Sequence, residues 1–500
     1  MRARKPLVND GGEVTSPVER LLKIIGMPLG LLVFLWLFFM PTPPGLTVQG
    51  QRALAVFWLA FILWLCMPIP VWLTSLIAIA LLGLTGAWDY KQAFYQFGNE
   101  VIWLMVAAFV IASALESSGI GKRLAYWMAS KVMKRASITL LGLIVLDYLL
   151  AFIVPSTTAR AAIMLPIALM ICEAYGVGPG SNFGKLVMLQ RPIANNLATS
   201  NIMTATAPQI LAWGFLLTLA GVEVSWSGWF IAQLPIILVT LVAMWLLGMI
   251  LWRPEVTEPK GGAERLKEEL RKLGPMTYKE KYTLAVFALT VFLWATDKWH
   301  TKMFFGYKIP YSLTAVIAAI LLFLPKYGVL TWKEAKIPWD LMIFSAGAYA
   351  VGLALEDTGA ARWMAMKIIR ALGLSPQTSA YKIYCALLGV MLFSHIFFSS
   401  KTVRTCIFIP LYIIFAQELG IPPAMIALPA AFAISWTISL PFNCKPNLIY
   451  FGTGYFTVIE EFAYGMLTCL IGYLLYITFG WWWFKWLGLH GWIPFTTGGG

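Results

Sequence analysis

The sequence predicts an all-α polytopic membrane protein with two inverted-topology repeats, each with a re-entrant hairpin and a broken helix, and about 11 transmembrane helices. Three observations predict this fold class. Of the 500 residues, 60% are hydrophobic and 12% are charged, whereas soluble domains are about a quarter charged. Apolar runs such as 233–251 are long enough to cross a bilayer as helices. Finally, the two halves carry matching polar stretches inside apolar segments.

The net charge of +14 agrees better with cytoplasmic membrane loops than with nucleic-acid binding, because basic residues collect in loops on the inner side. The main basic clusters lie at the N-terminus, at 122–135 and at 253–281. We therefore expect an integral protein of the plasma (inner) membrane with a cytoplasmic N-terminus. We expect the protein to be embedded in the lipid bilayer and to have no nucleic-acid partner.

The longest polar stretch, 253–281, divides the chain near its middle. We expect it to be a cytoplasmic linker with a short surface helix. In chain order, the predicted organisation is an N-terminal cytoplasmic segment with the first transmembrane helix (1–50), a first inverted repeat (51–252) with a re-entrant hairpin at about 136–176, the linker (253–281), a second inverted repeat (282–490) with a hairpin at about 379–420, and a tail (491–500).

Apolar runs and their breaks predict the individual helices. In the first half we expect helices at 22–40, 51–69, 71–87, 98–130 and 227–252, with a broken helix at 185–218. In the second half we expect 282–298, 309–328, 338–370 and 457–486, with a broken helix at 423–452. If the basic loops are all cytoplasmic, the halves begin on opposite sides of the membrane, which makes the repeats inverted.

Polar residues match between the halves. A shift of 244 places Ser156 on Ser400, Thr158 on Thr402, Arg160 on Arg404 and Pro166 on Pro410. A shift of 240 places 112–119 on 352–359, which makes Glu116 and Glu356 helix-end residues. Chance similarity between apolar segments is the alternative, but apolar composition does not supply matching hydroxyls and prolines.

Two kinds of polar element recur in each half. The predicted hairpin tips, 155–159 and 399–402, carry hydroxyls that suit helix caps whose N–H groups point at a ligand. The breaks, "NNLATSNIMTATAPQ" (195–209) and "LPFNCKPN" (440–447), combine Pro with Asn, Thr or Cys. A simple proline kink explains each break alone. Because each break follows a hairpin, a binding site is the favoured interpretation.

These motifs resemble the divalent-anion/sodium symporter family of di- and tricarboxylate transporters. That family has a Ser-Asn-Thr motif at each hairpin tip and a Thr-Pro-Pro-Asn-like break in each half. Here "STTARAAIMLP", "SKTVRTCIFIP", "TAPQ" (206–209) and "CKPN" (444–447) occupy those places. The "TAR" after the first tip resembles the exchanger members of the family. The resemblance covers roughly residues 50 to 490.

The resemblance implies a homodimer in which each subunit has a scaffold and a moving transport domain, working by an elevator-type alternating-access mechanism. It also implies that the substrate lies between the two tips and the two breaks. The substrate-binding residues implied in this way are Ser156, Thr157, Thr158, Ala207, Pro208, Ser400, Lys401, Thr402, Cys444, Lys445 and Pro446, with Asn443 in support.

Three positions depart from the family pattern. Thr157 and Lys401 replace the two motif asparagines, and Lys445 replaces a proline. At about 4 Å and an effective dielectric near 20, each lysine attracts a carboxylate by about 4 kcal/mol before desolvation. We therefore expect Lys401 and Lys445 to compensate substrate charge in place of sodium. A residual Na⁺ site near Ser156 and Thr157 stays open; no other metal or cofactor is expected.

Fixed lysines favour obligate exchange, because moving an unpaired charge through a membrane costs at least about 2.5–3.5 kcal/mol. The prediction is a secondary active, Na⁺-independent exchanger of dicarboxylates of the succinate, malate, fumarate and 2-oxoglutarate class, with citrate as a further candidate. The alternative is a Na⁺- or H⁺-coupled di/tricarboxylate or sulfate symporter. A membrane enzyme is disfavoured because the three histidines are widely separated, and a channel because hairpin repeats suit alternating access.

Several charged residues also have structural interpretations. Lys401 or Lys445 could snorkel or pair with a carboxylate. Arg160 and Arg404 lie one turn beyond the tips, so we expect them to brace the hairpins or pair with a carboxylate such as Asp147 rather than touch substrate. His395 is either a packing histidine, which we favour, or a proton site.

Overall fold

The structure is a computed structural model that describes residues 17–259, 263–375, 377–398 and 400–495. The predicted segments at 1–16, 260–262 and 496–500 lie outside the described residues. Every element in the described part is helical, as the predicted fold class requires. The chain divides into two compact units, Met1–Ile102 with Pro338–Ser375, and Trp103–Ile337 with Pro376–Gly500.

The smaller unit joins helices from both halves of the chain: α1 (Pro17–Phe39), α2 (Val48–Cys66), α3 (Val71–Leu84), α4 (Tyr90–Tyr95), η1 (Gln96–Gly98), α16 (Trp339–Asp357) and α17 (Ala360–Ala371). Helix α3 packs against α2 and α16. The α3–α16 approach depends on Gly347, where a Cβ would lie 2.4 Å from the Cβ of Ser75. Small residues permit such close packing in a bilayer, where apolar burial alone drives little association.

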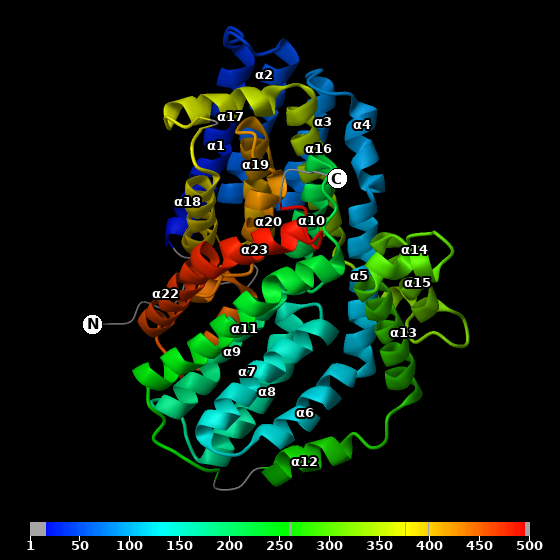
Figure 1. Cartoon of the computed structure of the whole chain (residues 1–500), viewed down its shortest axis with the longest axis vertical. Coiled ribbons are helices and arrows are strands. Elements are labelled where there is room, and N and C mark those ends of the chain that lie inside the picture. Colours follow the sequence, from blue (N-terminus) through cyan, green and yellow to red (C-terminus); the bar gives the residue numbers. More distant parts are fainter. Residues whose placement is uncertain (1–16, 260–262, 376, 399, 496–500) are drawn as a thin grey trace. The chain divides into compact units, whose positions relative to one another are not determined.

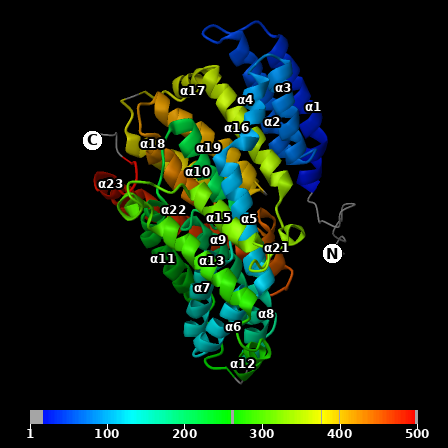
Figure 2. The same ribbon diagram turned by 90° about the vertical axis from the view of Figure 1, so that its right-hand side faces the viewer.

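The larger unit contains the remaining helices (Figures 1 and 2). They are α5 (Glu100–Ser118, whose first residues belong to the smaller unit), α6 (Ile120–Val132), α7 (Ala136–Ile153), α8 (Thr157–Tyr175), α9 (Asn182–Ser200), α10 (Ala207–Ala220), α11 (Trp226–Leu251), α12 (Ala263–Lys272), α13 (Tyr278–Ala295), η2 (Asp297–Trp299), α14 (His300–Met303), α15 (Tyr311–Phe323), η3 (Trp332–Glu334), α18 (Ala380–Phe393), η4 (Ser394–Phe397), α19 (Lys401–Glu418), α20 (Pro423–Ala433), η5 (Pro441–Asn443), α21 (Lys445–Phe451), α22 (Val458–Leu475), the π-helical turn η6 (Tyr476–Gly480) and α23 (Trp481–Leu489).

Both expected hairpins are present in the larger unit. Helices α7 and α8 are joined by the non-helical residues 154–156, and α18 and η4 are joined to α19 by 398–400, of which residue 399 lies outside the described residues. The α7–α8 hairpin and the α18–α19 hairpin enter the unit from opposite ends (Figure 1). This opposite entry is the arrangement that inverted repeats require.

Both expected breaks are also present, and they interlock the repeats. Residues 201–206 separate α9 from α10, and 434–444 separate α20 from α21. Each hairpin packs on the first part of its own broken helix, α8 on α9 and α19 on α20. Each also packs on the second part of the other one, because α21 contacts α8 and α10 contacts α19. The two tips and the two breaks are therefore brought to one place.

Two expected helices are divided by glycine. The segment 98–130 is α5 and α6, and 338–370 is α16 and α17. Gly119 and Gly359 stand at the junctions with φ of +79° and +72°, a backbone region that favours glycine. Their N–H groups donate to the carbonyls of Glu116 and Glu356 at 3.3 and 3.0 Å, so the expectation that these glutamates end helices is confirmed.

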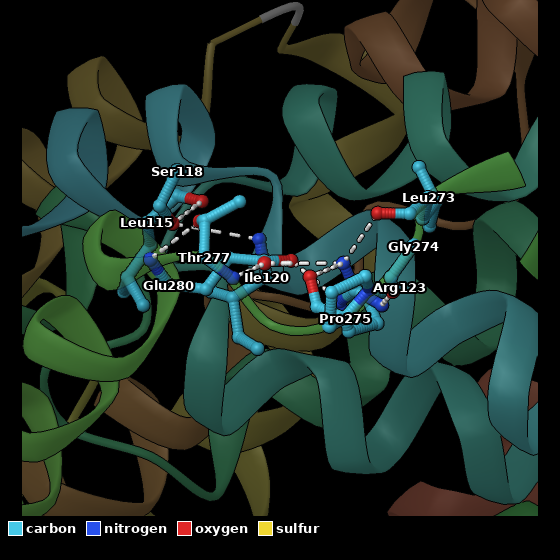
Figure 3. A network of polar contacts seen from close by, with 9 residues as sticks. All are labelled: Leu115, Ser118, Ile120, Arg123, Leu273, Gly274, Pro275, Thr277 and Glu280. Atoms are coloured by element: carbon cyan, nitrogen blue, oxygen red, sulfur yellow. Dashed lines mark hydrogen bonds and ion pairs between the residues drawn. The ribbon is translucent and has the colours of Figure 1, made fainter.

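The linker carries the expected short helix, α12, which packs against α6. Arg123 of α6 holds the end of the linker in place (Figure 3). Its guanidinium makes a bidentate pair with Glu280, at 2.6 and 3.1 Å, and donates to the carbonyls of Leu273 and Gly274 at 3.0 and 2.7 Å. The linker is thus fastened to the repeat that precedes it.

Eight described helices are long and apolar enough to cross a membrane, and three of them are the hairpin arms α7, α8 and α18. Four shorter apolar helices include α10 and α20, which are parts of broken helices. The expected total of about 11 transmembrane helices includes each broken helix as one crossing. The eight candidates, by contrast, are continuous helices within the described residues. Helices of this length and apolarity belong in a bilayer.

Candidate functional site

The candidate site is a cavity of about 250 Å³ inside the larger unit. It is formed by the two hairpin tips and the two helix breaks. Its lining residues are Phe109, Pro155, Ser156, Thr157, Thr158, Thr206, Ala207, Pro208, Ser400, Lys401, Thr402, Asn443, Cys444, Lys445 and Pro446. All the residues that the family resemblance implied for substrate binding are therefore in one cavity, although they come from segments up to about 290 residues apart in the sequence.

Four helices begin at this cavity. The N-caps Ser156 and Ser400 each accept a hydrogen bond from a backbone N–H at 3.3 Å, that of Ala159 in α8 and that of Val403 in α19. The break residues Thr206 and Cys444 precede α10 and α21 with φ of −157° and −161°. Helix N-termini carry a partial positive charge and unsatisfied N–H groups. Their convergence makes the cavity suited to an anion.

Two lysines add full positive charges, and no lining residue is acidic. Lys401 is the first residue of α19, and its Nζ donates to Oδ1 of Asn196 at 2.7 Å. Lys445 is exposed in the cavity, and no ion pair joins it to another described residue. The alternative that these lysines pair with a carboxylate is therefore not seen for either side chain in the described part of the chain.

The hydroxyl-bearing residues differ in their roles. Thr157 is held through its backbone, because its carbonyl accepts a hydrogen bond from Nδ2 of Asn195 at 2.8 Å. Thr158 and Thr402 are half-buried and line the cavity. No hydrogen bond joins their hydroxyls to other described residues, so both hydroxyls are free to bind a ligand.

Arg160 braces the first tip and does not line the cavity. It is fully buried, and its Nε donates to Oδ1 of Asn195 at 2.7 Å while Nη1 donates to the carbonyl of Val154 at 2.8 Å. The expectation of bracing is met, but Asp147 is not its ion-pair partner. Asp147 pairs instead with Arg191 of α9, at 2.7 Å and away from water.

Arg404 braces the second tip in a similar way. Its Nη2 donates to the carbonyls of Ala433 and Ile434, at 3.0 and 2.6 Å. Its Nε and Nη1 have no hydrogen-bond partner among the described residues. Each tip is thus fastened by a buried guanidinium that occupies carbonyl oxygens next to a helix end.

His395 is a packing residue in this structure. Its ring nitrogens lie 2.6 Å from the carbonyl oxygen of Leu392 and 2.8 Å from Oγ of Ser439. Asn443 donates to the carbonyls of His395 and Phe398 at 2.6 and 3.4 Å, which ties the break to the tip. Both ring nitrogens of His395 have structural partners, which agrees with the favoured interpretation.

Sequence reasoning missed the residue at the centre of the network, Asn196. Besides accepting from Lys401, its Nδ2 lies 3.1 Å from Sγ of Cys444 and donates to Oδ1 of Asn447 at 3.0 Å. It thereby joins the first break region to the second tip and the second break. The "NN" at 195–196, inside an apolar flank, was the signal that could have identified it.

Comparison with known proteins agrees with this architecture. A family model described as the sodium:sulfate symporter transmembrane region matches residues 22–490. The chain belongs to this family. The resemblance to divalent-anion/sodium symporters is therefore confirmed, and the chain is an integral membrane protein.

Relatives of this sodium:sulfate symporter family member cover most of its length. It is 29% identical over 472 residues to dicarboxylate transporter 1, chloroplastic, of Spinacia oleracea, covering 91% of this chain and 80% of the relative. It is 27% identical over 474 residues to the sodium-dependent dicarboxylate transporter SdcS of Staphylococcus saprophyticus, covering 91% and 90%. A Cupriavidus necator protein named only as a membrane protein is 28% identical over 497 residues, covering 95% of each chain.

A solved structure supports the fold alone. The YdaH transporter of Alcanivorax borkumensis superposes with a TM-score of 0.53 at 11% identity, covering 94% of this chain and 98% of that one. The family names and the two named relatives are those of symporters and transporters rather than enzymes.

Proposed function

We propose that this protein is a secondary active exchanger of dicarboxylates that works without Na⁺. The observation that carries the proposal is the cavity between the two tips and the two breaks, which has two lysines and no acidic residue in its lining. We propose the same lining residues as the substrate-binding residues, with Lys401 and Lys445 facing the carboxylates.

The charge and size of the cavity support a small dianion. Two ammonium groups balance two carboxylates, and the helix N-termini and the hydroxyls of Thr158 and Thr402 supply further hydrogen bonds. The volume of about 250 Å³ is many times the roughly 10–15 Å³ that a cavity needs to hold one water molecule. This is room for a C4 or C5 dicarboxylate with some of its hydration water, and the choice among such acids is left to experiment.

The guanidinium braces support the absence of sodium. In sodium-coupled carriers, unwound backbone carbonyls hold the ion beside helix breaks. In this chain the carbonyls of Val154, Ala433 and Ile434 accept N–H groups from Arg160 or Arg404. A carbonyl that already accepts from a guanidinium is a poor ligand for a second cation, because the two positive charges repel.

Fixed cations also support exchange. Lys401 and Lys445 cannot leave the carrier as Na⁺ can, so the empty carrier would move with uncompensated charge, at a cost of at least about 2.5–3.5 kcal/mol. A bound dianion removes most of this cost. We further propose an elevator-type movement, a homodimer, and a plasma-membrane location with a cytoplasmic N-terminus, which is the orientation that the basic loops favour.

Sodium-coupled symport of a dicarboxylate or of sulfate is the second candidate. The names of the family and of the Staphylococcus relative favour it, while the name of the spinach relative does not mention sodium.

The decisive experiment is uptake of radiolabelled succinate by proteoliposomes. Lumens preloaded with unlabelled dicarboxylate are compared with empty lumens, with and without external Na⁺. We expect uptake that requires preloading and is indifferent to Na⁺. Uptake into empty lumens driven by Na⁺ would reject exchange and establish symport. If succinate is not taken up, the same comparison with sulfate tests the substrate class.

A further inference from the structure

Glu461 is a buried carboxylate outside the cavity that the proposed function does not use. It lies in the first turn of α22 with 0% of its surface exposed. Neither of its carboxylate oxygens has a hydrogen-bond partner of suitable geometry among the described residues. The adjacent Glu460 differs in every respect, because it is partly exposed, caps the helix and pairs with Lys185 at 2.5 Å.

A hydrogen-bonded chain connects the neighbourhood of Glu461 to the cavity. Lys401 donates to Asn196 at 2.7 Å, and Asn196 donates to Asn447 at 3.0 Å. The Asn447 side chain lies beside the Glu461 carboxyl group, but its N–H groups donate to the carbonyls of Thr437 and Leu440, at 3.3 and 3.0 Å. The donor chain therefore runs from Lys401 through Asn196 to Asn447 and ends there, next to Glu461.

The elements packed around α22 offer Glu461 no cation within ion-pair distance. Helix α11 contains no charged residue. In α18 the charged residue is Lys382, and Arg404 of α19 faces Cys469, two turns along α22 from Glu461. Neither cation reaches the Glu461 oxygens within the described residues. In α9, Lys185 pairs with Glu460 and Arg191 with Asp147. In α21, Tyr450 is buried and Lys445 lines the cavity.

An ionised carboxylate in such surroundings is costly, and the usual outcome is that the group takes up a proton. We propose that Glu461 is a proton-binding site whose occupancy is linked to anion binding at Lys401. The positive charge of Lys401 favours the ionised carboxylate while the cavity is empty. A bound anion neutralises that charge, and a proton from bulk water then adds to a Glu461 oxygen.

The linkage is reciprocal, so protonation of Glu461 strengthens anion binding as much as anion binding favours protonation. This inference rests on the proposed function, because it needs an anion in the cavity. In the limit of one proton taken up per anion bound, the dissociation constant rises about tenfold per pH unit, and partial uptake gives a smaller slope.

The test is calorimetric binding of succinate to the purified full-length protein in two buffers of different ionisation enthalpy. Between neutral and mildly alkaline pH, where succinate itself stays a dianion, we expect net proton uptake and weaker binding as pH rises. Glu461→Gln should bind succinate with clearly less proton uptake than the wild type and with a shallower pH profile, the remainder belonging to the lysines of the cavity. Glu460→Gln is the matched control and should behave as the wild type.

Succinate binding by the wild type without proton uptake would overturn the inference and leave the proposed function intact, as would uptake in Glu461→Gln equal to that of the wild type. If that variant does not fold, the infrared spectrum of the ligand-free wild type decides. A buried protonated-carboxyl band that is present at acid pH, disappears on alkaline titration and returns when succinate is added is expected. A spectrum without such a band at any pH rejects the site. No binding of succinate by any variant would instead reject the proposed substrate, while the infrared band still decides whether Glu461 holds a proton.

Discussion

The two hairpin tips have nearly the same backbone but different charges. Ser156 and Ser400 cap their helices with φ of −144° and −122°, ψ of 117° in both, and hydrogen bonds of equal length. At the next position the first tip has the neutral Thr157 and the second has Lys401. The two tips therefore share the groups that form a helix N-terminus, but they differ in the charge that they place in the cavity.

The two tips also differ in the buried charged residues that lie behind them. Beneath the first tip is the buried ion pair of Asp147 and Arg191, whereas the shift of 244 that matches the two tips places the apolar Met391 at the position of Asp147. Arg404 and its counterpart Arg160 both lack a carboxylate ion-pair partner within the described residues, and only the second tip adds a lysine, Lys401. The second tip therefore carries more uncompensated positive charge than the first, and backbone symmetry does not imply electrostatic symmetry.

The largest expected effect follows from removing one member of that ion pair. Asp147→Asn leaves Arg191 buried and unpaired, which should cost about 3–5 kcal/mol of stability. Thermal unfolding of the purified protein measures the loss. The double variant Asp147→Met with Arg191→Met removes both charges, with the residue type of Met391 at position 147, and should recover most of the lost stability. A double variant less stable than the single one would show that the pair is not the source of the effect.

Lys401→Asn restores the family's residue and removes the charge that separates the tips. Loss of a charged hydrogen bond to substrate costs about 1.5–3 kcal/mol, or about 10- to 150-fold in affinity. Radiolabelled succinate binding measures this change. Lys336→Asn, which alters an exposed lysine paired with Glu116, is the control. Unchanged affinity in Lys401→Asn would mean that this lysine only holds Asn196 in place.

Thr158 and Thr402 occupy matching positions of the two tips, so substituting them tests whether both tips contribute equally to substrate binding. Replacing either by Val keeps the shape and removes a hydroxyl that is free in the cavity, so each should weaken succinate binding by about 1 kcal/mol, roughly fivefold. The double variant should show the sum of the two effects. A large effect at Thr402 and none at Thr158 would instead indicate that the substrate is bound by the second tip alone.

The matched glycines of the helix junctions test the equivalence of the two halves through stability, and no effect on substrate binding is expected there. Nothing lies within 4 Å of a Cβ added at Gly119 or Gly359, so Gly→Ala there adds only left-handed backbone strain of about 1–2 kcal/mol. Both variants should lose similar stability in thermal unfolding, and Gly→Asn should lose less. Unequal losses would show that the two junctions are not equivalent.

Much of the site was predictable because its signals are local. Polar residues in an apolar segment are conspicuous, and a Ser before a helix or a Pro at its second position has a meaning that neighbouring residues do not change. The hairpins, the breaks and the residues lining the cavity could therefore be identified from the sequence together with a family resemblance. The divisions at Gly119 and Gly359 are predicted only in part. The matched Glu116 and Glu356 indicate helix ends, but a glycine in an apolar run fits a continuous helix as well as a junction, so 98–130 and 338–370 are wrongly expected to be single helices.

The sequence by itself determined that this is a membrane protein with two matching halves, since composition and a repeated polar pattern need no folded context. Only the tertiary structure decided which charges meet. Arg160 and Arg191 both lie near Asp147 in the fold, and Glu460 and Glu461 are neighbours in the chain, yet one of each pair is ion-paired and the other is not. The physical reason is that ion pairing depends on a few ångströms of separation, which helix packing sets and which sequence spacing does not encode.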